Sequence, residues 1–106
     1  MKLVYCICRK PQLSREEFIR YWAGVHGLIG ARIPGLRRLV QSYALPAPGD
    51  DRPAAFDGMA ELWFDDLAAV LEARQSPEWE ASTADEANFV DPTRSAAFVS
   101  EERRIL

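Results

Sequence analysis

The segment LSREEFIRYWAGVHGLIG, residues 13–30, decides how this chain begins to fold. Ser14 and Glu17 have the spacing of a capping box, in which each side chain accepts a hydrogen bond from a backbone N–H at the start of a helix. Leu13 precedes this pair and is placed to pack against Phe18 one turn into the helix. The pattern therefore predicts that a helix starts at Ser14.

The only histidine of the chain lies on the apolar stripe of this helix. Phe18, Trp22 and His26 recur at every fourth position and therefore share one helical face. Three glycines interrupt the same stretch, and each costs about 1 kcal/mol relative to alanine inside a helix. We expect the helix to break or re-form near His26, so that the imidazole lies at a helix end.

Apolar runs on both sides of this helix predict four strands. The first covers Lys2 to Arg9, where β-branched and aromatic residues are followed by Pro11. The second begins after the turn signal Pro34-Gly35. The second, third and fourth strands are predicted over residues 36–45, 56–64 and 93–104, in that order.

The segments between the later strands contain turn and helix signals. PAPGDDRP, residues 46–53, combines proline, glycine and aspartate and predicts an exposed loop. Asp65 or Asp66 is placed to cap a second helix. Ser76-Pro77 restarts that helix, because proline is favoured at the first helical position.

The resulting order, β-α-β-β-α-β, predicts an α+β ferredoxin-like fold with two helices on one face of a four-stranded antiparallel sheet. The other face then lacks a cover. Apolar residues nevertheless occupy both faces of the first strand: Leu3, Tyr5 and Ile7 on one, Val4, Cys6 and Cys8 on the other. We therefore expect a homodimer that packs the two open faces together around a barrel-like space, although a different partner protein would satisfy the same burial.

Length and charge narrow the class of protein. A chain of 106 residues is expected to form one domain, residues 1–106, with no room for a separate cofactor domain. Its net charge of −3 argues against nucleic acid or an anionic membrane as a partner. No apolar run reaches the roughly 20 residues of a membrane span, and the first residues do not resemble a signal peptide, so a cytoplasmic protein is expected.

His26 is the candidate catalytic residue, because imidazole is suited to general acid or base chemistry near neutral pH. The alternative is a histidine that only hydrogen-bonds the backbone at a helix end. Cys6 or Cys8 would serve as a nucleophile beside it only if the first strand faced the same pocket; otherwise both are core thiols. One histidine without a second histidine or cysteine ligand argues against a metal site, and we expect no cofactor.

Polar and amphipathic residues alternate inside the second and third strands, and with Trp22 they form the candidate substrate-binding set. If they share the open face, the dimer interior is an aromatic pocket for a small hydrophobic molecule. If they do not, the aromatic members are interface residues and the carboxylate pairs with an arginine across the dimer. The strand members of this set are Gln41, Tyr43, Glu61 and Trp63.

Taken together, several segments resemble the EthD-like family of dimeric α+β barrel proteins over nearly the whole chain. They are Phe18, Tyr21-Trp22, Val25-His26-Gly27, Pro34-Gly35-Leu36-Arg37-Arg38, Asp57 to Phe64 and Ser76-Pro77-Glu78. The resemblance implies a protomer that dimerises through its sheet. Among enzymatic relatives it implies proton transfer on small oxygenated rings by a histidine corresponding to His26.

The resemblance also has departures that bear on function. Such relatives commonly carry a tyrosine where this chain has Leu39, and an isomerase among them carries a cysteine where it has Leu62. A second acid or base would then be another group, such as Tyr43 or Glu61.

Two functions follow as expectations, with haem binding through His26 as a third. The first is a cofactor-independent isomerase, decarboxylase or cyclase acting on a hydrophobic oxygenated small molecule. The second is a non-catalytic ligand-binding or accessory protein to an oxygenase system.

Overall fold

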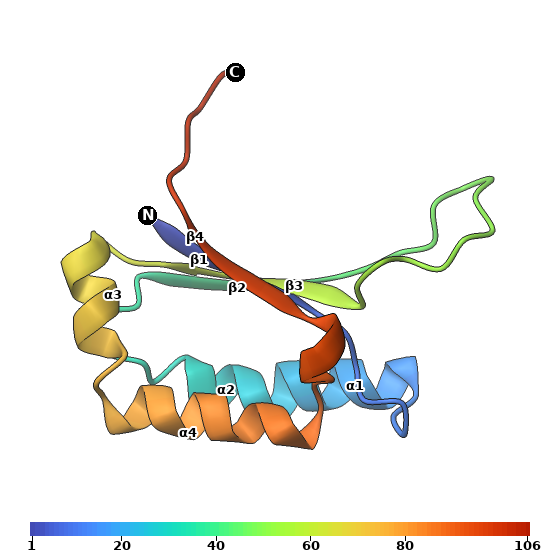
Figure 1. Cartoon of the computed structure of the whole chain (residues 1–106), viewed down its shortest axis with the longest axis horizontal. Helices are drawn as coiled ribbons and strands as arrows, with labels where there is room; N and C mark the ends of the chain where they lie inside the picture. The colour runs from blue at the N-terminus through green and yellow to red at the C-terminus, as the bar shows by residue number, and fades with distance from the viewer.

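The four strands form one antiparallel sheet in the computed structural model, which describes all residues 1–106 (Figure 1). In sequence they are β1 (Lys2–Ile7), β2 (Arg38–Tyr43), β3 (Gly58–Trp63) and β4 (Ala96–Ser100). Their spatial order is β2-β3-β1-β4, so that β1 is central and pairs with both β3 and β4. The predicted ferredoxin-like α+β class is confirmed. The last strand is shorter than expected, because residues 92–94 form a 3-10 turn and residues after Ser100 make no ladder.

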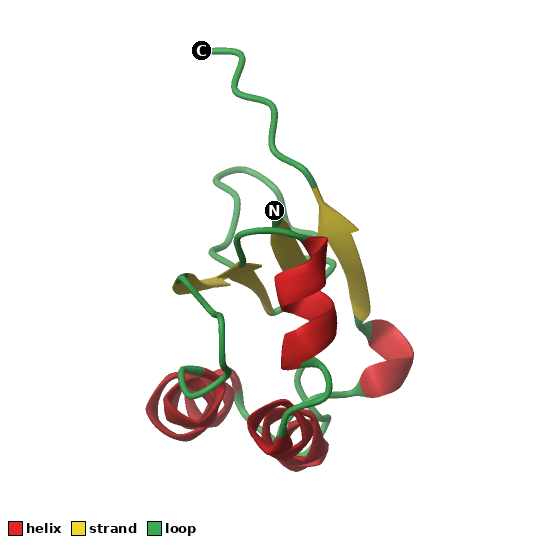
Figure 2. Cartoon of the chain, turned by 90° about the vertical axis from the view of Figure 1, so that its left-hand side faces the viewer, coloured by secondary structure: helices red, strands yellow, loops and turns green.

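The helices lie on one face of this sheet, as the view along them shows (Figure 2). α1 and α2 run as one rod beside α4, and α3 lies near one end of the sheet (Figure 1). The bounds are α1 (Arg15–Tyr21), the π-helix η1 (Trp22–His26), α2 (Gly27–Gly30), α3 (Leu67–Ala73) and α4 (Pro77–Asp85), followed by the 3-10 turns η2 (Glu86–Asn88) and η3 (Pro92–Arg94). No helix combines the length and the apolar character that crossing a membrane requires.

Local signals place the helix starts correctly. Ser14 caps α1, and its partner Glu17 completes the predicted capping box, with N–O distances of 3.1 and 3.0 Å. Asp66 caps α3 by accepting a hydrogen bond from the backbone of Ala69. Ser76 caps α4, and Pro77 occupies its first position. These short-range patterns suffice because each is completed within four residues.

The helix does not break near His26; of the two expected outcomes, it is the second that occurs, and the α-helix re-forms at Gly27. The backbone stays right-handed helical through this stretch, with φ −63° and ψ −40° at His26 and φ −57° and ψ −39° at Gly27. Instead of breaking, the helix widens into the π-helix, in which the Gly27 N–H bonds the carbonyl of Trp22. Burial of Trp22, 2% exposed, holds the widened turn in place despite the glycines. The imidazole therefore lies inside a continuous helical rod and not at a helix end.

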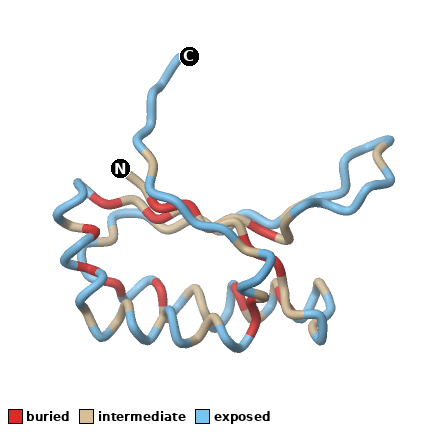
Figure 3. Tube along the Cα trace, viewed as in Figure 1, coloured by how far each residue is buried: buried red, intermediate tan, exposed pale blue.

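The core lies between the sheet and the helices, where the buried positions of Figure 3 concentrate. One cluster comprises Leu3, Ile33, Leu62, Phe64, Val70 and Ala73; the other comprises Ile7, Phe18, Trp22, Phe89 and Val90. The second cluster requires a glycine on β3, because a Cβ atom at Gly58 would lie 2.5 Å from the Trp22 ring. Leu13 packs against the same cluster, as the predicted staple requires.

The opposite face of the sheet carries no helix (Figure 2). Val4 pairs with Glu61 on β3 and with Phe98 on β4, and these three residues share the open face because paired residues in a ladder point the same way. Phe98 is 54% exposed. The predicted uncovered, partly apolar face is thus present in the protomer. Outside the sheet, residues 44–57 form a long loop, which includes the exposed loop expected over 46–53 (Figure 1).

Candidate functional site

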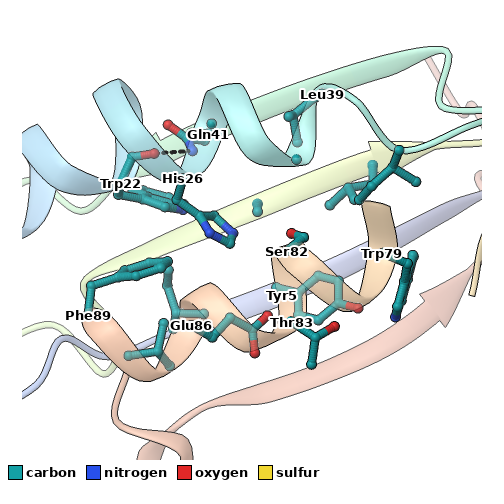
Figure 4. Close-up of a pocket in the computed structure, with 17 residues that line it drawn as sticks. Tyr5, Trp22, His26, Leu39, Gln41, Trp79, Ser82, Thr83, Glu86 and Phe89 are labelled. Atoms are coloured by element: carbon teal, nitrogen blue, oxygen red, sulfur yellow. Dashed lines mark hydrogen bonds between the residues drawn. The ribbon is translucent and has the colours of Figure 1, made fainter. Parts of the chain in front are cut away.

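A cavity of about 50 Å³ lies between the sheet and the helices (Figure 4). Ten of its 17 lining residues are hydrophobic. The polar side chains that reach it are His26, Gln41, Tyr5, Ser82, Thr83 and Glu86. This volume is smaller than that of typical drug-sized sites, so the cavity accommodates the reacting part of a ligand while any larger part extends outward.

His26 enters the cavity from η1 and is fixed by a carboxylate on α4. Its Nδ1 lies 2.8 Å from Oδ2 of Asp85, and the two side chains are 14% and 9% exposed. The ring also packs against Phe89, with centroids 4.6 Å apart. No protein group hydrogen-bonds the other ring nitrogen, Nε2, which is therefore available to a ligand.

Asp85 in turn is held by two further donors. Its Oδ1 accepts hydrogen bonds from the Tyr21 hydroxyl at 2.5 Å and from the Asn88 amide at 3.0 Å. Burial opposes ionisation of this carboxyl, but the hydrogen bonds from Tyr21, His26 and Asn88 outweigh it and lower the pKa of Asp85. The hydrogen bond to Asp85 raises the pKa of the Tyr21 hydroxyl.

The ionised Asp85 decides which ring nitrogen of His26 carries the proton. A carboxylate only accepts hydrogen bonds, so Nδ1 must be the donor, and in the neutral ring Nε2 then has a free lone pair. A histidine oriented by a carboxylate with its second nitrogen facing an apolar pocket is the arrangement of a general base.

The π-helix brings Tyr21 and His26 to the same carboxylate. Tyr21 and His26 are five residues apart. In an α-helix this separation is a rotation of about 500°, or one full turn plus about 140°, so the two side chains would point in different directions. The π-helical hydrogen bond spans five residues, from Gly27 N–H to Trp22 O, and realigns them. π-Helical turns of this kind are frequent at functional sites.

Of the predicted binding residues, Trp22 and Gln41 line the cavity. Gln41 donates a hydrogen bond of 2.9 Å from Nε2 to the Trp22 carbonyl, which also accepts the π-helical bond (Figure 4). This contact leaves the Gln41 amide oxygen without a protein partner.

The other three predicted binding residues do not reach the cavity. Tyr43 is 53% exposed and lies under the guanidinium of Arg15, 5.7 Å from the ring centroid. Glu61 forms an ion pair of 2.6 Å with Lys2 of the same chain. Trp63 lies between the charged groups of Lys2 and Arg38, and its indole N–H bonds Glu102.

The four strand residues do not share one face, so the condition for a pocket inside the dimer is not met, and the strand register is the reason. In the β2–β3 ladder Gln41 pairs with Ala60 and Val40 pairs with Glu61. Paired residues point to the same face of a sheet. Gln41 therefore shares the helix-covered face with Ala60, which lines the cavity, and Glu61 shares the open face with Val40. The pocket consequently lies within the protomer, between sheet and helices, and not inside the dimer.

Sequence reasoning missed Asp85 and the polar groups contributed by α4 and the turn after it. Asp85 lies 59 residues from His26, and nothing local to it marks a partner. Glu86, Ser82 and Thr83 follow one helical face, but α4 has a mixed composition without a clear apolar stripe. Only the packing of α4 against α2 brings these residues to the histidine.

Both cysteines lie away from the cavity. Neither Cys6 nor Cys8 lines the cavity, and the Cys8 thiol donates instead to the carbonyl of Ala55 at 3.4 Å. A nucleophilic pair with His26 is therefore absent. No three histidine, cysteine, aspartate or glutamate side chains gather as a metal site would require.

Comparisons with known proteins agree with this fold. A family model described as the EthD domain matches residues 10–93. An EthD family protein from Bacillus halodurans C-125 is 24% identical, with a TM-score of 0.81, and the alignment covers 96% of this chain and 97% of that one. No curated protein matches the sequence significantly.

Two further solved structures share the fold at lower identity. A dimeric protein of unknown function with a ferredoxin-like fold, from Bacteroides fragilis, is 17% identical, with a TM-score of 0.63 and coverage of 92% of this chain and 90% of that chain. SnoaB of Streptomyces nogalater, a cofactor-independent oxygenase solved in a mutant form, is also 17% identical, with a TM-score of 0.62 and coverage of 99% and 96%.

Proposed function

The chain belongs to the EthD domain family, and from this membership and the geometry of the cavity we propose that it binds a small, hydrophobic, oxygenated molecule and moves a proton on it with His26. The observation that carries the proposal is the 2.8 Å contact of Nδ1 with Asp85, which leaves Nε2 free at an apolar cavity. The solved relative that is a cofactor-independent oxygenase supports chemistry without a cofactor on this fold.

The reaction step needs no co-reactant. Nε2 removes a proton from a carbon next to a carbonyl or from a ligand hydroxyl, and the imidazolium that forms is stabilised by Asp85. Returning the proton to another atom of the same molecule gives an isomer.

We also propose that the protein is a cytoplasmic homodimer, with the open face of the sheet as its interface. Val4 and Phe98 lie on that face, no helix covers it, and Phe98 is 54% exposed while Val4 is already buried by its neighbours. Solved relatives with this fold include proteins described as dimeric. In such a dimer each protomer keeps its own complete cavity.

A second candidate function is non-catalytic binding, as an accessory protein to an oxygenase system. Leu39 and Leu62, which stand where enzymatic relatives were expected to carry a phenol and a thiol, both line the cavity. These side chains contact a ligand but cannot transfer a proton. Binding without turnover is then the distinguishing property.

The experiment that tests proton transfer is His26→Gln. Ketones and lactones that raise the melting temperature are incubated with protein in D₂O, and loss of the proton signal next to the carbonyl is followed by NMR. We expect His26→Gln to slow exchange by about 10²-fold or more, because general base catalysis typically contributes that much. Ligand affinity should change little.

The control is Tyr43→Phe, which alters a predicted binding residue that lies outside the cavity and should exchange at the wild-type rate. Equal exchange by wild type and His26→Gln would refute the catalytic proposal. Tight binding with no exchange by either protein would favour the accessory function.

A further inference from the structure

Glu86 places a carboxyl group in the cavity without a partner. It lies at the start of η2, directly after Asp85, and its side chain makes no hydrogen bond or ion pair with the protein. Figure 4 shows the Glu86 carboxyl and the His26 ring reaching the same space from different elements. A half-buried carboxyl without a protein donor is costly unless a ligand or water satisfies it.

The wall around Glu86 offers hydroxyl groups and no cation. Tyr5, Ser82 and Thr83 line the cavity near it, and none of their hydroxyls hydrogen-bonds another protein group. No lysine or arginine is among the 17 lining residues. The guanidinium of Arg74 lies outside, 5.7 Å from the ring centroid of Trp79. A ligand carboxylate would therefore meet Glu86, and no lysine or arginine lines the cavity to balance the two negative charges.

The electrostatics of the site agree with this geometry. Burial raises the pKa of Glu86, and the neighbouring charge of Asp85 raises it further. Burial also raises the pKa of Tyr5, with a contribution from Glu86 in the same direction and one from Arg74 in the opposite direction. Both shifts have burial as their main cause, so a further negative charge in this part of the cavity is unfavourable.

We propose that Glu86 makes this cavity selective for neutral, carbonyl-bearing molecules and against carboxylates of the same shape. The inference rests on the proposed function, because it concerns the cavity that His26 faces, and it narrows the ligand class. The hydroxyl of Tyr5 donates to the ligand oxygen, the Glu86 carboxylate repels a ligand carboxylate, and His26 faces another part of the same molecule.

Acetophenone and benzoate provide the test, because they share a ring and nearly the same shape and differ in charge at pH 7. His26 is the only histidine, so no other imidazole signal overlaps with it. Its imidazole ¹H–¹⁵N resonances therefore report binding at the site directly. Both compounds are titrated into wild type, Glu86→Gln and Glu80→Gln. Glu80 is an exposed carboxylate on α4 and serves as the matched control.

We expect acetophenone to bind wild type at least about tenfold more tightly than benzoate. If the carboxylates of Glu86 and benzoate lie about 4 Å apart in a partly buried site, their repulsion lowers the affinity for benzoate by more than about tenfold. Glu86→Gln should therefore tighten benzoate binding about tenfold and change acetophenone binding by less than about threefold. Glu80→Gln should leave both affinities as in wild type.

Three results would overturn the inference: no binding of acetophenone to wild type, equal binding of the two compounds to wild type, or the same benzoate affinity in wild type and Glu86→Gln. None of these depends on turnover. Failure of proton transfer by His26 would instead appear in the exchange experiment, so the two proposals fail separately.

Discussion

The contact between His26 and Asp85 fixes both the tautomer and the direction of the imidazole ring. Tyr21 and Asn88 complete the network by donating to the same carboxylate. Burial raises the pKa of Asp85, and the hydrogen bonds from its three donors lower it. The net lowering of this pKa therefore depends on the donors being present. Removing the carboxylate while keeping the side-chain shape isolates its contribution.

Asp85→Asn should lower the proposed proton exchange and make the stability of the protein less dependent on pH in the acid range. The folded pKa of Asp85 lies below the ordinary value of 3.8, so its contribution to stability is present above that pH and disappears as pH falls through the folded pKa. Urea unfolding at pH 7 should show Asp85→Asn to be less stable than wild type. The difference should shrink as the pH falls below 3.8, and a difference that stays constant with pH would contradict the assignment.

Single residues also mark where sequence reasoning reaches its limit. Ser14 and Glu17 were predictable because their partners lie three residues apart. His26 was identifiable as a candidate because it is unique, whereas Asp85 was not, because the pair is made only when α4 packs beside α2. The side on which Glu61 lies depended on the register of two strands, which no local pattern specifies.

At the scale of elements, β3 and the π-helix pack tightly against each other at Gly58. The ring of Trp22 lies over Gly58, and the carbonyl of Ser42 on β2 approaches from the side. The order of helices and strands followed from apolar periodicity and turn residues. The π-helix did not, because glycines in a helical pattern predict a weak point without specifying whether the helix breaks or widens.

Gly58→Ala should therefore destabilise the protein. The new Cβ atom would lie 2.5 Å from the Trp22 ring and 2.9 Å from the Ser42 carbonyl, and overpacking of this kind typically costs about 1–3 kcal/mol. Gly24→Ala is the matched control, because no atom lies within 4 Å of its added Cβ. It should stabilise the helix by up to about 1 kcal/mol. Chemical denaturation of both variants measures the difference, and equal stabilities would argue against the close packing.

At the level of the whole molecule, one helical layer covers one face of the sheet and the other face stays open (Figure 2). The fold class was predictable because it follows from the order of elements. The position of the pocket was not, since it depends on the side to which each strand residue points. Separation of pocket and open face implies that association and ligand binding can be altered independently.

Phe98→Arg should convert the proposed dimer into a monomer of 12.0 kDa. Phe98 is 54% exposed and lies on the open face, where a charge would be buried between two sheets. Val99→Arg changes the next residue of the same strand, which points to the opposite face, and should leave the mass unchanged. Light scattering after size-exclusion chromatography measures the mass. A monomeric wild type would refute the interface.

The central position of β1 has a consequence for synthesis of the protein. The first strand to leave the ribosome pairs with β3 and with β4, whose residues are made last. Until residues 96–100 emerge, one edge of β1 has no neighbour and exposes unpaired N–H and C=O groups. Chains that end before residue 96 therefore leave β1, otherwise an inner strand, as an unpaired edge strand. Truncation before residue 96 should yield insoluble protein instead of a slightly shortened folded one.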